Sequence, residues 1–330
     1  MRRFNETMRA KLTAVCGLSV LCAAPVALGQ TTLLVSDESG NKVVRFDYPS
    51  GLVFNHFAGA GASPLDRGQY MALTPEGDVL VASFDSDSVQ KYNGKTGRFI
   101  STFVTVGSGG LNGPTGILYG PDGNLYVSSK DNDTVLRYDG VTGVFMDVVA
   151  SGINQPWGIA FGNDGTLIVA GFAGDRVAMF DPDTAAFLGD IDTSATALDA
   201  PTGMTTDAAG NIYVAGFNSD SVVKIDESTH VASVFVLPSV SLDGPHAIQF
   251  DDDGNLLVVS SRTGSVLKYS AGGSFLGVVI SPATDGGLNG TRGLLAYTPN
   301  EDCVADMNDD GLVDFFDVQA YLNAYSAGCP

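Results

Sequence analysis

Basic residues are scarce in this sequence of 330 residues. Lys and Arg number 17 against 37 Asp and Glu, which gives a formal net charge of -20 at pH 7. Nucleic acid is therefore a poor partner, because proteins bind the phosphate backbone mainly through Lys and Arg. Three histidines and one tryptophan are present. The motifs of a phosphate-binding loop and of a serine nucleophile elbow are missing.

Long hydrophobic runs are also missing. The first 29 residues combine a basic start, a short apolar run broken by Pro25, and small residues at Ala27 and Gly29. This pattern predicts a secretory signal peptide over residues 1–29, with a membrane anchor as the alternative. Cleavage would leave 13 Lys and Arg against 36 Asp and Glu, a formal charge of -23, and no transmembrane segment.

Cysteine is rare, and only Cys303 and Cys329 lie outside the predicted signal peptide. Both fall near the end of the sequence, and an exported chain meets an oxidising environment. We therefore expect a disulfide between them, with a surface thiol pair as the alternative. Closing that loop is worth roughly 3 to 4 kcal/mol, which matters for a segment too small to hold a core alone.

Repetition is what the sequence has in abundance. Strand-like segments recur as PEGDVLVAS, PDGNLYVSS, NDGTLIVAG, AAGNIYVAG and DDGNLLVVS, and TTLLVSD precedes them as a sixth copy. A further strand pattern follows each copy, and its first valine falls at Val43, Val89, Val135, Val177, Val222 and Val266. Steps of 46, 46, 42, 45 and 44 residues with short alternating strands are typical of propeller blades.

Polar pairs separate the two strand patterns of each repeat. They are residues that tolerate positive φ, so we predict two-residue hairpin turns at Gly40-Asn41, Ser86-Asp87, Asn132-Asp133, Gly174-Asp175, Ser219-Asp220 and Thr263-Gly264. The acids of FDSDS, KDNDT and FDDDGN fall in turns, where Asp bonds backbone N–H groups. We interpret these acids as structural.

The two ends of the repeat array are each incomplete. No inner strand precedes the first copy, and no further strands follow the last inner strand, NGTRGLLAYTP from Asn289. Pairing of the two ends would close the ring and remove open sheet edges, which an open six-repeat solenoid would leave bare. We predict an all-β, six-bladed β-propeller over residues 30–299, closed by its terminal strands, with a small EF-hand-like loop and helix over residues 300–330.

The patterns GPTGILYGPDG, DGNLYV and DTVLRYD resemble NHL-repeat propellers and the related streptogramin-lyase-like and gluconolactonase-like propellers. The resemblance implies the fold and says little about activity, because the matching residues form turns and cores. Gluconolactonase-like proteins hold a divalent metal with Glu, Asn and Asp in the channel, a set not matched here. Streptogramin-lyase-like proteins use histidine and glutamate, whereas His56 and His230 fall in an expected outer strand and outer turn.

The start of each inner strand should face the mouth of the central channel, where propellers bind ligands. The residues expected there are unlike one another, as a binding site requires: Gln69, Thr115, Trp157, Thr202, His246 and Arg292. We expect a protein or glycan to bind here, with positions free of function as the alternative. In an enzyme, His246 and Arg292 could act as general acid and anion clamp; otherwise His246 caps its strand and Arg292 pairs with a carboxylate.

The tail carries the spacing of a calcium-binding loop. Oxygen ligands fall at loop positions 1, 3, 5, 7, 9 and 12, with Gly311 at the sixth place: Asp306, Asn308, Asp310, the backbone carbonyl of Leu312, Asp314 and Asp317. Seven acids and no basic residue lie beyond Gly293, and such a cluster repels itself without a cation. We expect calcium, with a solvated acidic turn as the alternative.

The loop and the helix pattern that follows it resemble a dockerin repeat, although dockerins carry two repeats and this tail has one. The resemblance implies a cohesin-like or envelope partner, and Phe316 falls where dockerins present partner-contacting side chains. Packing of Phe316 against the chain near Cys303 is the alternative. The sequence thus favours a bacterial binding module, secreted, periplasmic or at the cell surface, over a secreted lactonase-like or lyase-like enzyme.

Overall fold

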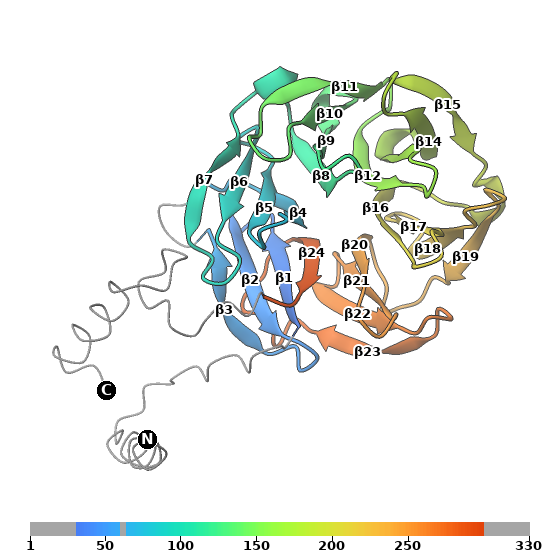
Figure 1. Ribbon diagram of the computed structural model, residues 1–330. Helices are drawn as coiled ribbons and strands as arrows, with labels where there is room; N and C mark the ends of the chain where they lie inside the picture. Colours follow the sequence, from blue (N-terminus) through green and yellow to red (C-terminus); the bar gives the residue numbers. More distant parts are fainter. Residues whose placement is uncertain (1–30, 60–63, 300–330) are drawn as a thin grey trace, which may run out of the picture. The chain divides into compact units, whose positions relative to one another are not determined.

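The computed structural model describes residues 31–59 and 64–299 of the chain. These residues form six four-stranded antiparallel sheets arranged as blades around a common axis (Figure 1). The helices of this part are short 3-10 turns at Ser108–Gly110 (η1), Lys130–Asn132 (η2), Phe172–Gly174 (η3) and Ser194–Thr196 (η4). The predicted all-β, six-bladed propeller is confirmed.

Each blade begins at the axis with an inner strand. From the first blade to the sixth, the inner strands are β24 (Thr291–Tyr297), β4 (Gly68–Leu73), β8 (Pro114–Tyr119), β12 (Pro156–Phe161), β16 (Pro201–Thr206) and β20 (Pro245–Phe250). The second strands are β1 (Thr32–Asp37), β5 (Val79–Ser83), β9 (Leu125–Ser129), β13 (Leu167–Gly171), β17 (Ile212–Gly216) and β21 (Leu256–Ser260).

The two remaining strands of each blade lie farther from the axis. The third strands are β2 (Lys42–Asp47), β6 (Ser88–Tyr92), β10 (Thr134–Tyr138), β14 (Arg176–Asp181), β18 (Ser221–Ile225) and β22 (Ser265–Tyr269). The outer strands are β3 (Val53–Ala58), β7 (Phe99–Val104), β11 (Phe145–Ser151), β15 (Ala186–Ile191), β19 (Ala232–Val236) and β23 (Phe275–Ile280).

The first blade combines the two ends of the propeller. Its strand order is β24-β1-β2-β3, and β24 pairs antiparallel with β1 from Thr32 opposite Tyr297 to Val35 opposite Leu294. The sequence prediction that the last inner strand completes the first blade is therefore correct. The described ring therefore consists of six complete four-stranded blades.

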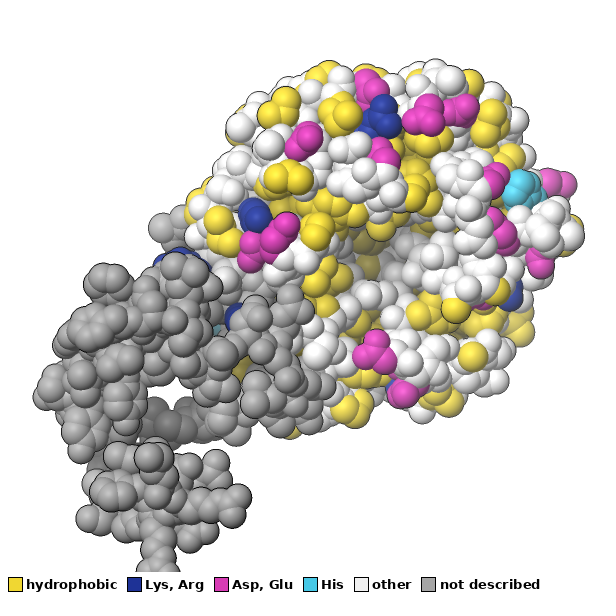
Figure 2. Space-filling model, in the orientation of Figure 1, with side chains coloured by type: hydrophobic (Ala, Val, Ile, Leu, Met, Phe, Trp, Pro, Cys, Tyr) yellow, Lys and Arg dark blue, Asp and Glu magenta, His cyan; other side chains and the backbone are white. Residues whose placement is uncertain are grey.

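The hydrophobic core lies between neighbouring blades. In each blade the second strand is buried along its whole length, because each sheet is covered on both faces by the adjacent sheets. The buried apolar residues form six clusters, one for each pair of adjacent blades. The outer strands are partly exposed, and Figure 2 shows hydrophobic side chains over the visible face and a hollow at its centre.

The predicted two-residue hairpins differ from the observed turns. Four residues connect each second strand to its third strand, and only the second member of each polar pair has positive φ. In five blades this member is Asn or Asp, and its side-chain oxygen accepts the amide N–H of the residue before the next inner strand. These side chains link neighbouring blades, and two of them, Asp87 and Asp133, belong to the FDSDS and KDNDT turns. In the sixth blade the position is Gly264, which has no side chain to form the link.

Candidate functional site

The six residues predicted at the channel mouth occupy one equivalent position. Each is the second residue of its inner strand: Gln69, Thr115, Trp157, Thr202, His246 and Arg292. In all six strands a bulge lies between the first and fourth residues, where the pairing with the second strand shifts by one. Bulges of this kind turn side chains away from the regular sheet direction.

Two members of this set bind the neighbouring blade instead of facing the mouth. The Thr115 hydroxyl donates to the Pro156 carbonyl at 3.1 Å, and the Thr202 hydroxyl donates to the Pro245 carbonyl at 3.0 Å. Both threonines are fully buried. Gln69 is buried as well, and its Oε1 has no hydrogen-bond partner within the described part of the chain. Thr115 and Thr202 therefore hold the inner strands together.

His246 is enclosed by aromatic rings. The Tyr70 hydroxyl lies 2.9 Å from His246 Nδ1, and the two rings stack with centroids 5.6 Å apart. The rings of Trp157 and Phe217 meet the imidazole edge-on, at 5.0 and 5.9 Å. Burial, together with the positive charge of Arg292, lowers the pKa of His246 well below its ordinary value. The imidazole is therefore neutral at pH 7.

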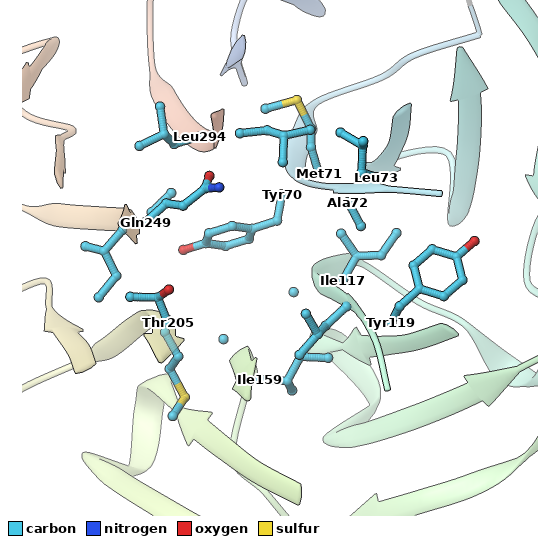
Figure 3. Close-up of a pocket in the computed structure, with 17 residues that line it drawn as sticks. Tyr70, Met71, Ala72, Leu73, Ile117, Tyr119, Ile159, Thr205, Gln249 and Leu294 are labelled. Atoms are coloured by element: carbon cyan, nitrogen blue, oxygen red, sulfur yellow. The ribbon is translucent and has the colours of Figure 1, made fainter. Parts of the chain in front are cut away.

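Tyr70 projects into the central channel (Figure 3). The equivalent third position of four other inner strands is glycine, at Gly116, Gly158, Gly203 and Gly293. The Tyr70 ring instead extends across the centre of the channel (Figure 3). Burial raises the pKa of its hydroxyl, and the charge of Arg292 opposes this only in part. The Trp157 N–H also lowers the pKa of Tyr70, although it has no hydrogen-bond partner within the described part of the chain.

A second set of equivalent residues lies at the mouth. Each directly follows a second strand, and its backbone N–H donates to the carbonyl of the residue before an inner strand. The residues are Glu38, Phe84, Lys130, Phe172, Phe217 and Ser261. None of the motifs in the sequence points to them. Aligning the repeats at the end of the second strand would have revealed six unlike side chains at one position.

Three cations and four aromatic rings form part of a closed circuit at the mouth. The Arg67 guanidinium lies 4.7 Å from the centroid of the Phe84 ring. The Lys130 ammonium lies 5.3 Å from the Phe84 centroid and 5.5 Å from the Trp157 centroid. Each distance is within the range of a cation–π contact. One half of the mouth thus alternates positive charge and aromatic surface.

The other half of the circuit is aromatic and ends in an ion pair. The Trp157 and Phe172 centroids are 5.2 Å apart, and those of Phe172 and Phe217 are 6.0 Å apart. The Arg292 guanidinium lies 6.0 Å from the Phe217 centroid, and its Nε donates to Glu38 Oε2 at 2.5 Å. Glu38 also pairs with Arg67, which closes the circuit. We call this the mouth ring: Glu38, Arg67, Phe84, Lys130, Trp157, Phe172, Phe217 and Arg292.

Glu38 supplies the carboxylate that the sequence analysis did not find at the channel. Burial alone would raise its pKa, but the charges of Arg292 and Arg67 and their hydrogen bonds outweigh that effect and hold the pKa below its ordinary value. The Arg292 Nη1 also donates to the Ser261 hydroxyl at 3.0 Å. Glu38 is therefore ionised at neutral pH and fixes the orientation of both guanidinium groups.

Several donors of the mouth ring remain open. Within residues 31–59 and 64–299, Arg292 Nη2 has no hydrogen-bond partner, because the hydrogen bonds of this side chain use Nε and Nη1. The Lys130 ammonium has one ion-pair partner there, Asp131, at 3.5 Å. Trp157 Nε1 is buried without a hydrogen bond in the same part of the chain. Buried donors without partners are rare, so a ligand that accepts hydrogen bonds fits this mouth.

The remaining predictions on site residues fall elsewhere. The signal peptide, the calcium ligands from Asp306 to Asp317, Phe316, Cys303 and Cys329 lie outside the described residues and stay predictions. In the described part, no three His, Cys, Asp or Glu side chains are grouped so that they could hold a metal ion. No helix within residues 31–59 and 64–299 is long and apolar enough to span a membrane.

Comparison with known proteins identifies the fold. No protein-family model and no curated protein matches the sequence. A Bacteroides caccae protein of unknown function has 16% identity and a TM-score of 0.64, over 81% of this chain and 98% of that one. A chain of the nidogen/laminin complex has 16% identity and a TM-score of 0.65, over 83% and 100%.

A third similar structure is an enzyme. A catalytically inactive histidine-to-alanine variant of virginiamycin B lyase from Staphylococcus aureus, solved with quinupristin, has 15% identity and a TM-score of 0.54. The match covers 69% of this chain and 73% of the lyase. At such identities the likeness is one of fold, and it includes proteins with unlike roles.

Proposed function

We propose that this protein is a binding module that recognises an acidic glycan at the mouth ring. The observation that carries the proposal is the closed circuit of cations and aromatic rings with unfilled donors on a chain of formal charge -20. Positive charge gathered at one mouth attracts an anionic group, even when the rest of the surface is acidic.

The two kinds of side chain suit two parts of such a ligand. Lys130 and Arg292 would bond a carboxylate of the glycan, because charge-assisted hydrogen bonds are roughly twice as strong as neutral ones. Trp157 and Phe172 offer flat apolar surface to the C–H faces of the sugar rings, and the Trp157 N–H adds a donor. An acidic loop of a protein partner is the alternative ligand.

Catalysis at the same mouth is the second candidate function. The fold shared with virginiamycin B lyase favours it, since the lyase is an enzyme built on a similar propeller. His246 is buried, however, and its Nδ1 is occupied by the Tyr70 hydroxyl. A general acid must reach a substrate proton directly or through one water. Binding without catalysis is therefore the better-supported function, and a lactonase-like or lyase-like reaction is the alternative.

The rest of the proposal concerns export and attachment. We infer NHL-type repeats, export through the signal peptide of residues 1–29, and a dockerin-like tail over residues 300–330. Calcium held from Asp306 to Asp317 and a disulfide between Cys303 and Cys329 would stabilise the tail. A cohesin-like protein or the bacterial envelope would be its partner, with Phe316 as a contact.

The proposal can be tested through Trp157, the one tryptophan of the sequence. Because it lies in the mouth ring, its fluorescence reports on ligands there. We expect polygalacturonate to change the emission and to bind more weakly as salt rises, and neutral dextran to leave it unchanged. Loss of one charge-assisted bond in Lys130→Met should weaken binding about tenfold, which corresponds to about 1.4 kcal/mol.

Lys91 provides the matched control, because it pairs with Asp78 and takes no part in the mouth ring. Lys91→Met should bind polygalacturonate as the unchanged protein does. Equal binding of dextran and polygalacturonate, or equal affinity of Lys130→Met and Lys91→Met, would contradict the proposal. The tail is tested separately by calcium titration calorimetry of the mature chain beside a version that ends at Pro299.

A further inference from the structure

A second candidate site lies farther along the inner strands, beyond their second residues. It is a cavity of about 290 Å³ between the inner strands, and its lining reaches the ends of these strands at Leu73 and Tyr119. Most of the lining is apolar, including Ile117, Ile159, Met204, Ile248 and Leu294. Figure 3 shows these strands contributing side chains from all sides, with the Tyr70 ring projecting among them.

Charge is absent from this cavity. None of its lining residues is Asp, Glu, Lys, Arg or His, whereas the mouth ring contains four charged groups. Burial of an ion in such surroundings is costly, because no side chain there can pair with it. The cavity therefore selects against charged ligands.

The polar side chains of the lining are almost all in use. Gln249 donates to the Ala296 carbonyl at 3.0 Å and accepts from its N–H at 2.8 Å. The Tyr119 hydroxyl donates to the Gly140 carbonyl at 3.0 Å, and that of Tyr70 meets His246. Within residues 31–59 and 64–299, the hydroxyl of Thr205 is the one side-chain polar group of the lining without a partner.

Size sets a further limit on the occupant. An apolar cavity of about 150 Å³ in another protein stays free of water and binds benzene. The present cavity has about twice that volume, so it can hold a molecule of two fused rings. A single hydroxyl or carbonyl group on such a molecule could bond Thr205.

We propose that this cavity binds a small uncharged molecule of about two fused rings, largely apolar, whose one polar group bonds the Thr205 hydroxyl. The site is distinct from the mouth ring, because no residue that lines the cavity belongs to that ring. The proposal does not depend on recognition of a glycan, and either one can fail without the other.

The test compares 2-naphthol with 2-naphthoate by isothermal titration calorimetry on the complete chain at pH 7. The two probes share their rings, and only 2-naphthoate is charged. We expect 2-naphthol to bind at least tenfold more tightly. Absence of 2-naphthol binding up to its solubility limit, or equal affinity for the two probes, would overturn the proposal.

Two substitutions locate the bound probe. Ile159→Trp fills the cavity and should abolish 2-naphthol binding, and Thr205→Val should weaken it about fivefold. Thr206→Val is the matched control, because Thr206 is exposed next to Thr205 and does not line the cavity. If Ile159→Trp does not fold, as judged by its melting curve, the position of the probe is tested by comparing the affinities of Thr205→Val and Thr206→Val for 2-naphthol. Equal affinity of these two variants for 2-naphthol would refute the assigned position.

Discussion

The two ends of the central channel differ in chemistry although the same six strands build both. At the start of the inner strands the side chains are charged, aromatic or hydrogen-bonding, and at their ends they are mostly aliphatic. The second residue changes from blade to blade, from Thr115 to Trp157 to His246, while the fourth is Ile117, Ile159 and Ile248 in three of the blades. Repetition therefore builds the scaffold, and departures from it build the sites.

Removal of the Tyr70 ring from the channel should have the largest effect. Tyr70→Gly deletes a partly buried aromatic ring and its bond to His246, so we expect a loss of about 3 kcal/mol in the free energy of unfolding. The measurement is urea unfolding. Tyr70→Phe, which removes only the hydroxyl, should cost about 1 kcal/mol.

Tyr70→Gly should also open a path between the mouth ring and the cavity. Bound 2-naphthol should quench Trp157 in Tyr70→Gly and leave its emission unchanged in Tyr70→Phe. If Tyr70→Gly unfolds at the same urea concentration as Tyr70→Phe, the ring does not pack in the channel as described above.

Loss of the mouth carboxylate should have an intermediate effect confined to one end. Glu38→Gln leaves Arg292 and Arg67 without their shared anion, and we expect a loss of about 1 to 2 kcal/mol, because Arg67 is partly exposed. Thermal unfolding at pH 7 measures this loss. Binding of 2-naphthol at the other end should not change.

The effect of Glu38 should depend on pH in one direction. The folded state lowers the pKa of Glu38, so its contribution is complete above the ordinary pKa of about 4.3 and is lost as the pH falls through the lower folded value. The difference in stability between the unchanged protein and Glu38→Gln should therefore shrink on acidification below about pH 4. A difference that stays constant from pH 7 to pH 3 would contradict the ion-pair assignment.

Loss of one link between blades should have the smallest effect. The Asp133 carboxylate accepts the Gln155 N–H at 2.8 Å, two residues before Trp157. Asp133→Gly reproduces the situation at Gly264 and should cost about 1 kcal/mol by urea unfolding. Asp133→Asn should stay within about 0.5 kcal/mol of the unchanged protein, because Asn41 makes the equivalent bond to Arg67. A larger loss for Asn than for Gly would refute the link.

The fold could be predicted because its signals are local and repeated. The spacing of Val43, Val89 and their counterparts fixes the third strands, and the missing inner strand before Thr32 predicts the closure with β24. The ring of second residues could be located for the same reason. The turn length could not, because the pair Ser86-Asp87 is compatible with a two-residue turn and with the four-residue connection observed.

Contacts between residues of different blades could not be predicted from the sequence. Glu38 and Arg292 are 254 residues apart, and nothing local marks them as a pair. Three residues of the mouth ring look in the sequence like ordinary hydrophobic residues in turns: Phe84, Phe172 and Phe217. Their position at the channel mouth depends on closure of the ring, which brings the turns together. In the sequence, Tyr70 of RGQYMALTPEG stands where GPTGILYGPDG has glycine, but nothing local indicates the direction of its ring.

The pairing of β24 with β1 has a consequence for biosynthesis. Thr32 meets Tyr297 across 265 residues, so the first blade cannot be completed until nearly the whole propeller has been translated. Until then β1 presents an unpaired edge to other chains, the kind of intermediate that aggregates. Contacts so distant in sequence also slow folding, because chain entropy is lost before they form. Pairing of β24 with β1 therefore removes the exposed edge at which the newly made protein could aggregate.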